Sequence, residues 1–401
     1  MKLSVIIISY NVKHYIEQCI RSIWKSAEHA GIETEVFVVD NNSRDNTIEH
    51  LVNQFPAASY PHLHLIANSR NVGFGRANNQ AARQAKGEYI LFLNPDTLLT
   101  ENTLGDCIKF ADICPDLGGL GVRMIKADGA FAFESRRGLP TPWTAFCKMS
   151  GLAAAFPHSK LFGKYYMRYL DEEQIEEIEI ISGAFFMTTQ KALQRCGLFD
   201  EDFFMYGEDI DLSHRMRLAG LHNYYHPTII LHYKGESTQK SSYKYVHIFY
   251  EAMLIFFKKH YRHYHQVLSI PIKFAIIARA IIALCGRGIE SLGRYLSLGV
   301  REKEEKFLFL GSEKNAQDIK QIAERWQLDI ECITASEEDL PQGHLQIGNA
   351  IAHRYYIIYD LDVYSHHTLL DIFYSSPRKH SLGTYTSRNR TAITTAATYP
   401  L

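Results

Sequence analysis

Short apolar runs alternate with amphipathic stretches along the first hundred residues. Four runs, "LSVIIISY", "TEVFVVD", "LHLIANS" and "GEYILFL", are each followed by polar residues and predict strands. After the first run, Ile16, Ile20, Ile23 and Trp24 recur at helical spacing, and further helices are expected in "TIEHLVNQF" and from about residue 75 to 86. This alternation predicts a parallel sheet covered on both faces by helices.

The polar ends of these predicted strands share one property, because the carboxyl ends of parallel strands meet at one edge of a sheet. They are Ser9-Tyr10-Asn11, Asp40-Asn41-Asn42, residues 68–75 and Asn94-Pro95-Asp96. The predicted site lies at that edge. Since no GxGxxG follows the first strand, the pattern does not favour a nicotinamide or flavin dinucleotide.

Beyond about residue 235 the chain becomes rich in aromatic and basic residues, and "VLSIPIKFAIIARAIIALC" is strongly apolar. Lys273 and Arg279 interrupt that run, and a charge at a bilayer centre costs about 2.5–3.5 kcal/mol. A spanning helix is therefore not expected. An interfacial helix and ordinary core packing stay as alternatives. The bases available to anionic headgroups in the first alternative are Lys258, Lys259, Arg262, Arg279, Arg287 and Arg294.

A further α/β pattern begins at Lys306, with strands expected in "KFLFLGS", "LDIECIT" and "RYYIIYDLD" and a helix in "NAQDIKQIAERWQ". Asp360 and Asp362 have the spacing of metal ligands, but two acids at a strand end are more often solvated. The sequence thus predicts a main α/β domain over residues 1–235, a helical basic and apolar segment over 236–300, and a small accessory α/β domain over 301–401.

Composition narrows the classes of function. The 401 residues are 46% hydrophobic and 22% charged, which is typical of a folded protein, and the net charge of -1 gives no global field that would attract nucleic acid. The seven cysteines lie far apart without a CxxC pair, which argues against a disulfide framework or a zinc cluster and favours a reducing compartment. The apolar start, "MKLSVIIISYNV", is interpreted as the first strand because it lacks a small-residue cleavage site.

Seven motifs in order carry a family resemblance: "SVIIISYN", "VVDNNSRDNT", "NVGFGRANN", "LNPD", "SGAFFM", "GLFDEDFFMYGEDIDLSHRMRLAG" and "HYKGES". Together they resemble the family 2 glycosyltransferases of GT-A fold, particularly the rhamnosyltransferase-like members, over roughly residues 1–240. The resemblance implies a Rossmann-like mixed sheet with helices on both faces. It also implies a nucleoside-diphosphate sugar as donor.

The resemblance assigns the nucleotide pocket to the first three motifs. Asp40 corresponds to the acid that accepts a hydrogen bond from the pyrimidine ring. An alternative role for Asp40 is the N-cap of the following helix, a role that Asn42 or Ser43 could fill instead. The glycines of "NVGFGRANN" precede a helix whose free N–H groups can face a diphosphate. The nucleotide-sugar-binding residues expected here are Ser9, Asn11, Asp40, Asn42, Gly73, Gly75, Arg76 and Asn79.

A Mn²⁺ or Mg²⁺ site is implied by Asp96 and His232. Asp96 matches the last acid of the family's metal motif, and Asn94 departs from its two-acid form, so Asn94 is expected to supply an amide oxygen or an outer contact. One acid suffices, because these ions take one or two carboxylates from protein and the rest of their ligands from diphosphate and water. Imidazole from His232 favours manganese.

The catalytic base is expected in "YGEDIDLSHRMRLAG". By the resemblance Asp209 takes the proton from the acceptor hydroxyl, with Glu208 as the substitute, although acids in a first helical turn are common for dipole reasons alone. Arg215 is expected to compensate diphosphate charge or to pair with Asp211 at i, i+4. Gly183 would leave room for a hexose ring.

The function expected from the sequence is inverting transfer of a sugar, possibly rhamnose as in the family members it resembles, to a hydroxyl of a glycan or lipid-linked acceptor in cell-surface polysaccharide synthesis. The rival hypothesis is a non-catalytic nucleotide-sugar-binding or scaffolding protein whose metal site has decayed. The expected partners are the donor, the acceptor and, with an interfacial helix, a membrane surface, but not nucleic acid. The expected location is cytoplasmic, or peripheral on the inner face of the plasma membrane.

Overall fold

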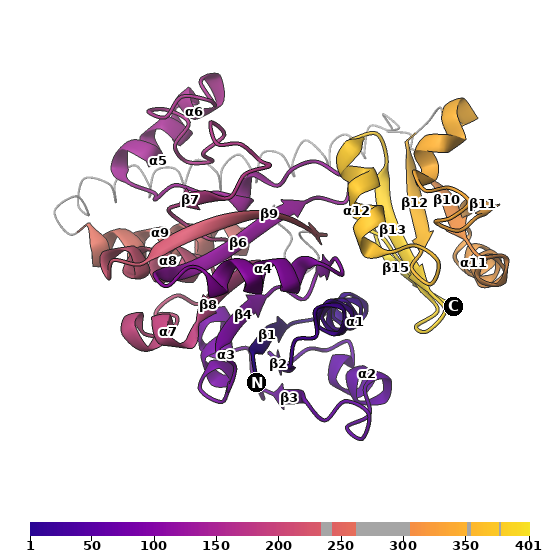
Figure 1. The fold of residues 1–401 in the computed structure, drawn as a ribbon, viewed down its shortest axis with the longest axis horizontal. Helices are drawn as coiled ribbons and strands as arrows, with labels where there is room; N and C mark the ends of the chain where they lie inside the picture. The colour runs from indigo at the N-terminus through magenta and orange to yellow at the C-terminus, as the bar shows by residue number, and fades with distance from the viewer. Residues whose placement is uncertain (234–242, 262–304, 351–353, 377) are drawn as a thin grey trace.

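The computed structural model describes residues 1–401 apart from 234–242, 262–304, 351–353 and 377 (Figure 1). The described chain forms two sheets. The elements of the first part are β1 (Leu3–Ser9), α1 (Lys13–Ala30), β2 (Thr34–Asp40), α2 (Thr47–Gln54), β3 (Leu63–Ala67), α3 (Phe74–Ala82), β4 (Tyr89–Leu93), β5 (Thr97–Leu99), α4 (Thr103–Asp112), β6 (Leu117–Ile125), η1 (Phe133–Ser135), α5 (Pro142–Met149), α6 (Leu152–Ala155), β7 (Glu176–Ile178), β8 (Phe185–Thr189), α7 (Gln190–Cys196), α8 (Glu208–Leu218), β9 (His222–His232) and α9 (Tyr243–His260). Those of the second are β10 (Lys306–Gly311), α11 (Glu313–Trp326), β11 (Asp329–Thr334), η3 (Gly343–Ala350), β12 (Tyr355–Asp360), α12 (His366–Ser375), β13 (Ser381–Thr386), β14 (Thr391–Ile393) and β15 (Thr398–Pro400).

The main sheet has the order β3-β2-β1-β4-β8-β6-β9-β5, with β7 added alongside β9. β1 lies parallel to β2 and β4, whereas β8 runs antiparallel to β4 and to β6. All seven residues of β1 are buried, as expected for a parallel strand covered on both faces. The sheet is therefore mixed, and the predicted fold class is confirmed.

Alternate side chains of the strands separate the two faces of this sheet. Val5 and Ile7 of β1 join the core beneath α1 and α4, while Ile6 and Ile8 join the core beneath α3, α7 and α8. The period of two in the strand and the amphipathic period of the helices thus determine which helix covers which face. The helices predicted after β1 and β2 are both present.

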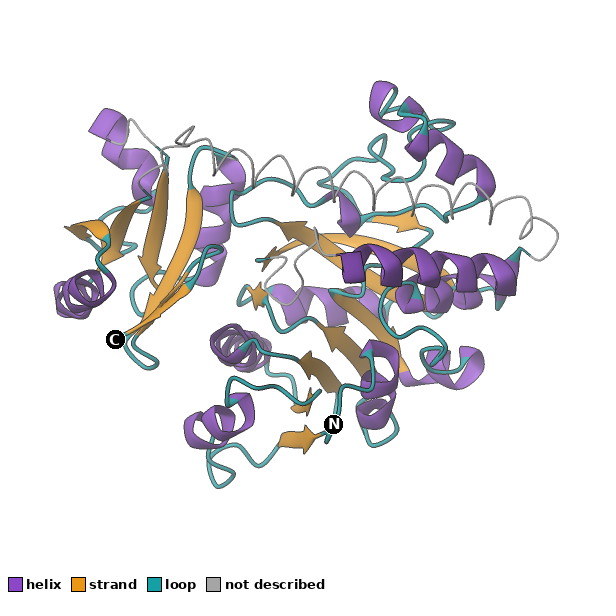
Figure 2. Cartoon of the chain, turned by 180° about the vertical axis from the view of Figure 1, so that it is seen from behind, coloured by secondary structure: helices purple, strands orange, loops and turns teal. Residues whose placement is uncertain are grey.

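The helix α9 corresponds to the start of the segment predicted as interfacial or packed. Its Ala252 and Phe256 are buried against Phe203 and Ile210, beside α8 at the back of the molecule (Figure 2). Lys259 forms ion pairs with Asp200 and Asp202, and His260 lies 2.7 Å from Asp211. These residues of α9 therefore support the core-packing alternative, and residues 262–304 lie outside the described residues. Among the helices described, none is long and apolar enough to cross a membrane.

The second sheet has the order β11-β10-β12-β13-β14-β15, in which the first four strands are parallel and β14 and β15 are antiparallel. α11 covers one face through Ile319 and Ile322, which pack on Phe307 and Phe309. The three predicted strands and the predicted helix are confirmed. Asp360 is fully buried and accepts hydrogen bonds from Ser312 and Asn315, so it connects β12 to the start of α11.

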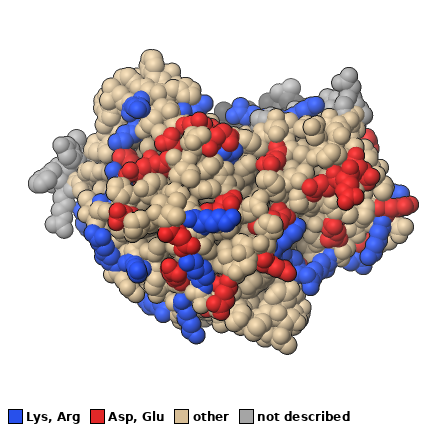
Figure 3. Space-filling model, viewed as in Figure 1, with Lys and Arg blue, Asp and Glu red and all other residues tan. Residues whose placement is uncertain are grey.

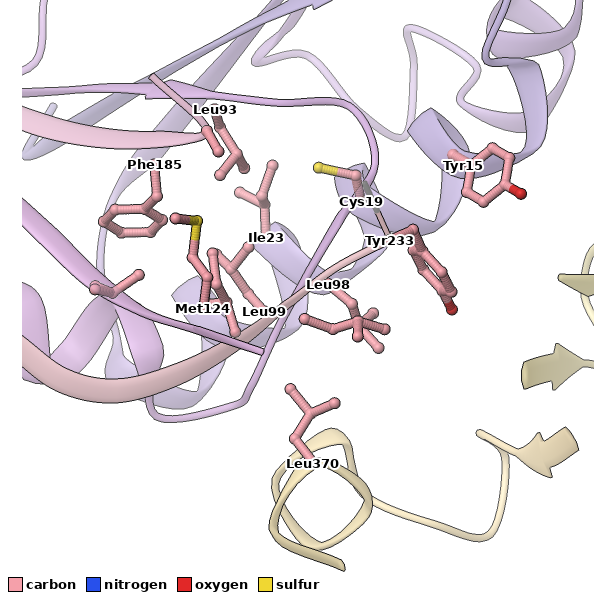
Figure 4. Packing of buried hydrophobic residues seen from close by; sticks show 14 of the residues in the cluster. Tyr15, Cys19, Ile23, Leu93, Leu98, Leu99, Met124, Phe185, Tyr233 and Leu370 are labelled. Carbon is pink, nitrogen blue, oxygen red and sulfur yellow. The ribbon is translucent and has the colours of Figure 1, made fainter. Parts of the chain in front are cut away.

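The other face of the second sheet packs on the first part of the chain through α12. Leu370 of α12 lies against Leu98 and Leu99 of β5 in one continuous core (Figure 4). Polar contacts surround this core: the Glu101 carboxylate accepts hydrogen bonds from the backbone N–H groups of His366 and His367 at 3.0 and 2.9 Å. The two sheets are therefore joined by a buried interface.

Candidate active site

The carboxyl ends of the parallel strands meet at one edge of the main sheet, as the sequence predicts. Ser9 stands opposite Asp40 in the β1–β2 register. Beyond the strands, the backbone N–H of Asn41 donates to the Ser9 carbonyl at 2.9 Å, and that of Asn68 donates to the Asp40 carbonyl at 2.9 Å. These bonds hold three of the predicted loops side by side.

Asp40 holds the loop that follows β2. Its carboxylate accepts hydrogen bonds from the backbone N–H and the hydroxyl of Ser43, and the side chain of Asn11 accepts from the backbone N–H of Arg44 at 2.7 Å. The N-cap residue of α2 is Asn46, and the preceding Asp45 accepts from the backbone N–H of Thr47 at 3.2 Å. The alternative prediction that Asp40 is the N-cap of α2 is therefore wrong, and neither Asn42 nor Ser43 has that role.

Two smaller features belong to the same edge. The hydroxyl of Ser9 is buried and has no hydrogen-bond partner among the described residues. Asn42 is exposed and has a φ of 65°, a backbone region that asparagine adopts more readily than most residues. A buried hydroxyl without a partner and an exposed amide are both compatible with a polar ligand at this edge.

The two predicted metal ligands are brought together by strand pairing. Thr97 of β5 pairs with His232 of β9, and the backbone N–H of Tyr233 donates to the Asp96 carbonyl at 3.0 Å. As a result Nε2 of His232 lies 3.4 Å from Oδ1 of Asp96 and 3.4 Å from the side-chain nitrogen of Asn94. Residues 138 positions apart in sequence thus form one polar group.

This group fits a divalent ion that brings further ligands with it. Within the described ranges no cluster of three His, Cys, Asp or Glu residues could hold a metal by itself. Asp96 and His232 offer a carboxylate and an imidazole, and Nδ1 of His232 is buried without a hydrogen-bond partner among the residues described. A Mn²⁺ or Mg²⁺ ion held by two protein ligands would need diphosphate and water oxygens to complete its shell.

Gly73 of the Gly-x-Gly loop approaches the chain's own backbone. A Cβ at this position would lie 2.6 Å from the carbonyl oxygen of Phe204, and the φ of Gly73 is +90°. The next residue, Phe74, donates its backbone N–H to the same carbonyl at 2.8 Å. The glycine is therefore required by the segment before α8 as well as by any ligand in front of it.

Gly73→Ala is expected to lower the free energy of unfolding by about 2–4 kcal/mol, because it adds a clash with backbone to an unfavourable φ. Gly31→Ala is the matched control, since Gly31 also has a positive φ but nothing within 4 Å of its Cβ position. Chemical denaturation of both variants measures the difference. Equal losses at the two sites would show that the contact with Phe204 does not require glycine.

The polar side chains after the Gly-x-Gly loop hold a neighbouring loop. Asn79 is buried, donates to the Phe199 carbonyl at 2.8 Å and to Glu201 at 3.0 Å, and accepts from the Phe199 backbone N–H at 3.1 Å. Arg76 donates to the other carboxylate oxygen of Glu201 at 3.0 Å. The structure therefore gives Asn79 a supporting position, in contrast to the free diphosphate donor that the sequence predicts.

The Glu-Asp pair begins α8 and is buried. Oδ2 of Asp209 accepts hydrogen bonds from the guanidinium of Arg137 and from the backbone N–H of Gly183, the latter at 3.0 Å. Oε2 of Glu208 is buried and has no hydrogen-bond partner among the described residues. Burial and the neighbouring Asp209 charge raise the pKa of Glu208 to about 8.

Arg137 is the residue of this site that sequence reasoning missed. Its side chain is largely buried, and it donates to Asp209 and to the Ile181 carbonyl, the latter at 3.0 Å. Although burial lowers the pKa of Arg137, the Asp209 carboxylate more than compensates and raises it. The ion pair fixes the position of the Asp209 carboxylate. The available signal was two adjacent arginines in "SRRG", which no motif of the resemblance includes.

Glu208→Gln is expected to change how stability depends on pH. Because the folded protein keeps the Glu208 proton up to a pKa of about 8, while the unfolded chain releases it near the ordinary value of 4.5, raising the pH through this window destabilises the wild type. Glutamine has no such proton. The Tm of Glu208→Gln minus that of wild type should therefore grow between those two pH values, whereas Glu324→Gln, exposed on α11, should show no trend.

Arg215 does not face the Glu-Asp pair. Its Nε donates to Asp211 at 2.7 Å, and its terminal nitrogens donate to the backbone carbonyls of Cys196 and Leu198. The predicted i, i+4 pair is confirmed. The charge of Arg215 is used to connect α8 to the end of α7, so compensation of diphosphate charge by this residue finds no support in its contacts.

Direct contacts connect the remaining motifs to one another. Asn41 donates to the Gly73 carbonyl at 3.2 Å, and Cβ of Glu208 lies 3.8 Å from the Cβ position of Gly75. On the other side, the Cβ position of Gly183 lies 3.5 Å from Cβ of Asp209, and Asn94 donates its backbone N–H to the Ala184 carbonyl at 3.0 Å. The predicted base, sugar and metal motifs therefore form one contiguous set of contacting residues.

A mixed α/β sheet of this order, with polar loops gathered at the carboxyl ends of β1, β2 and β4, is a GT-A-like fold. Residues 4–197 match the family model described as Glycosyl transferase family 2. The chain therefore carries a family 2 glycosyltransferase domain, and the predicted family is confirmed.

Relatives with assigned names support the same class. The N-acetylglucosaminyl-diphospho-decaprenol L-rhamnosyltransferase of Mycobacterium tuberculosis (strain CDC 1551 / Oshkosh) is 25% identical over 266 residues, which cover 63% of this chain and 83% of that protein. Rhamnosyltransferase WbbL of Escherichia coli (strain K12) is 27% identical over 253 residues, 57% of this chain and 82% of that protein.

Among solved structures, the mannosyltransferase PcManGT from Pyrobaculum calidifontis in complex with GDP-Man and Mn²⁺ is 19% identical to this chain. The match covers 75% of this chain and 81% of that chain, with a TM-score of 0.45.

Proposed function

We propose that the protein is an inverting, metal-dependent glycosyltransferase that moves a hexose from a nucleoside diphosphate to a hydroxyl of a glycan or lipid-linked acceptor. The carrying observation is the set of direct contacts from Asn41 through Gly73 and Glu208-Asp209 to Asn94. In the proposal the nucleoside binds near Asp40, the diphosphate near Asp96 and the sugar, at the far end of the diphosphate, near Gly183. An in-line displacement needs this arrangement of a donor with a base at its sugar.

Asp209 is the proposed base. At neutral pH Glu208 holds a proton, because its pKa is raised to about 8, and so it is not free to act as the base, whereas the Asp209 carboxylate is held by the Arg137 ion pair. Asp209 can therefore accept the proton of the acceptor hydroxyl as the oxygen attacks the anomeric carbon. The bond from that carbon to the diphosphate breaks in the same step, so no protein nucleophile is required.

Asp96 and His232 are the proposed protein ligands of the metal, with Asn94 beside them. A bound Mn²⁺ or Mg²⁺ supplies charge that stabilises the departing diphosphate. Arg137 orients the base, because its guanidinium holds the oxygen that Gly183 also contacts. Rhamnose is the proposed sugar on the names of the two rhamnosyltransferase relatives, one of which is named for a decaprenol-linked diphosphate.

A panel of nucleotide sugars tests this proposal. Thermal unfolding with UDP-, GDP- and dTDP-sugars, each with and without Mn²⁺, should identify one donor that raises Tm more when the metal is present. Slow release of the corresponding nucleoside diphosphate should follow with that donor. Binding without any release would support the rival, a nucleotide-sugar-binding protein, and no stabilisation by any donor would reject both.

A further inference from the structure

The projection formed by residues 139–170, which contains α5 and α6, has an unusual composition. It contains Lys148, Lys160, Lys164 and Arg168 and no aspartate or glutamate, although acids make up 44 of the 401 residues of the chain. The projection stands out from the body of the molecule in Figures 1 and 2. In Figure 3 its tip is drawn in tan, with blue beside it. The projection itself therefore carries a net positive charge, although the acids Asp171, Glu172, Glu173, Glu176 and Glu177 follow it directly in the chain.

The same projection exposes large apolar side chains that contact one another. Trp143, Phe146, Phe156 and Leu161 are 44%, 54%, 54% and 58% exposed. The rings of Trp143 and Phe146 stack with centroids 5.8 Å apart, and Phe162 connects Trp143 to Phe156 at 6.1 and 5.6 Å. A contiguous exposed aromatic patch on a folded protein marks a contact surface.

The base of the projection is fixed beside the proposed active site. The backbone N–H of Gly138 donates to the Tyr165 carbonyl at 3.0 Å, and that of Leu139 donates to the Glu179 carboxylate at 2.7 Å. Arg137, immediately before it, holds Asp209. The base of the projection is therefore connected directly to a residue of the proposed active site.

We propose that the projection over residues 139–170 docks the protein on an anionic lipid bilayer, with Trp143, Phe146, Phe156 and Leu161 entering the headgroup and acyl boundary. Interfacial segments combine an apolar aromatic face with Lys and Arg that attract anionic headgroups. Lys164 is paired with Glu179, but Lys160 is exposed and no ion pair is found for it among the described residues, so its charge is available. Trp143 is suited to this boundary because its ring is apolar and its N–H is polar.

Charge also argues against a second copy of the chain as the occupant. A symmetric dimer through this surface would place the same patch on both subunits and bring the like charges of Lys160 together, whereas Lys164 is already paired with Glu179 at 3.1 Å. Like charges facing each other destabilise such an interface. An anionic bilayer supplies the opposite charge and the apolar layer together.

Tryptophan fluorescence tests the docking directly. Vesicles of phosphatidylcholine with phosphatidylglycerol should shift the emission of the full-length protein to the blue, and pure phosphatidylcholine vesicles should not. Trp143→Phe should abolish the shift. Trp326→Phe is the matched control, because Trp326 is 43% exposed on α11 and Trp143 is 44% exposed on α5. A shift that persists in Trp143→Phe would overturn the proposal.

Vesicle sedimentation measures the strength of docking. Phe146→Ser/Phe156→Ser should weaken partitioning more than about tenfold, whereas Val52→Ser, at the same 54% exposure on α2, should not. Lys160→Glu should weaken partitioning at least about fivefold and Lys320→Glu, exposed on α11, should not. If the variants of the projection partition onto vesicles as wild type does, the proposal is rejected. It is also rejected if the protein forms a dimer that only Phe146→Ser/Phe156→Ser disperses. Donor-induced thermal shifts should be unchanged in all variants, so this outcome is independent of the proposed activity.

Discussion

Asp209→Asn is expected to slow sugar transfer by about 10²- to 10⁴-fold, because asparagine keeps the size of the side chain but cannot accept a proton. Donor affinity should stay close to that of wild type, since Asp40, Gly73 and Asp96 lie in other loops. The measurement is the transfer rate together with donor affinity, with the donor found in the thermal panel and a matching acceptor.

Glu208→Gln is the comparison within the same pair. If Glu208 only holds a proton at neutral pH, glutamine in its place should leave most of the transfer rate intact. Collapse of the rate in Glu208→Gln with near-normal transfer in Asp209→Asn would move the base to Glu208. Normal transfer in both variants would remove the pair from catalysis.

Asp96→Ala should remove the coupling between metal and nucleotide. In the wild type a nucleoside diphosphate is expected to raise Mn²⁺ affinity by about 5- to 150-fold, because Asp96 and His232 supply too few ligands alone and the diphosphate completes the shell. Calorimetric titration of Mn²⁺ with and without the nucleoside diphosphate measures the two affinities. Without Asp96, Mn²⁺ binding should become weak and nearly independent of the nucleotide.

His232→Ala should reduce the same coupling, since Nε2 of His232 lies 3.4 Å from the Asp96 carboxylate. Asp329→Ala, an exposed aspartate at the start of β11, is the control and should leave both affinities unchanged. Equal Mn²⁺ affinity with and without nucleotide in the wild type would refute the coupling. Unchanged binding in Asp96→Ala would exclude that residue from the metal site.

The strands that the sequence predicts can be recognised without knowing which strands and helices lie beside them. β1, β2 and β4 are continuous apolar runs, as parallel strands buried on both faces must be. β6 escapes the pattern because it contains three glycines, and a Cβ at Gly119 would lie 2.5 Å from the Ile181 side chain. Those glycines resemble a loop until the side chains that pack over them are known.

β9 escapes prediction for a different reason. Pro227 interrupts its alternation, and the pairing with β6 shifts register between Val122 and Arg123, opposite His226 and Ile229. Proline is tolerated in a strand at such an irregularity because its missing N–H is not needed there. The bulge is a tertiary feature, so neither it nor the strand that crosses it can be read from local periodicity.

The residues of the candidate site also divide into those that a local sequence signal predicts and those that depend on distant partners. Motifs with a local signal, such as Asp40 after β2 and Glu208-Asp209 at the start of α8, lie where the sequence places them. Arg137 reaches Asp209 from 72 positions away, and Asn79 is satisfied by a loop 120 positions away. Partners that are distant in sequence decide whether a polar side chain is free for a ligand, and they become visible only in the folded chain.

The carboxylate that caps α12 comes from the glycosyltransferase part of the chain. Glu101 binds the first N–H groups of α12, and Leu370 of that helix completes the core over Leu98 and Leu99. Recombination at the sequence boundary near residue 301 would therefore leave an uncovered apolar surface on one product and, on the other, a helix that keeps its Ser365 N-cap but loses the carboxylate bound to its first N–H groups. The accessory sheet is bound to its own catalytic domain and is not an interchangeable cassette.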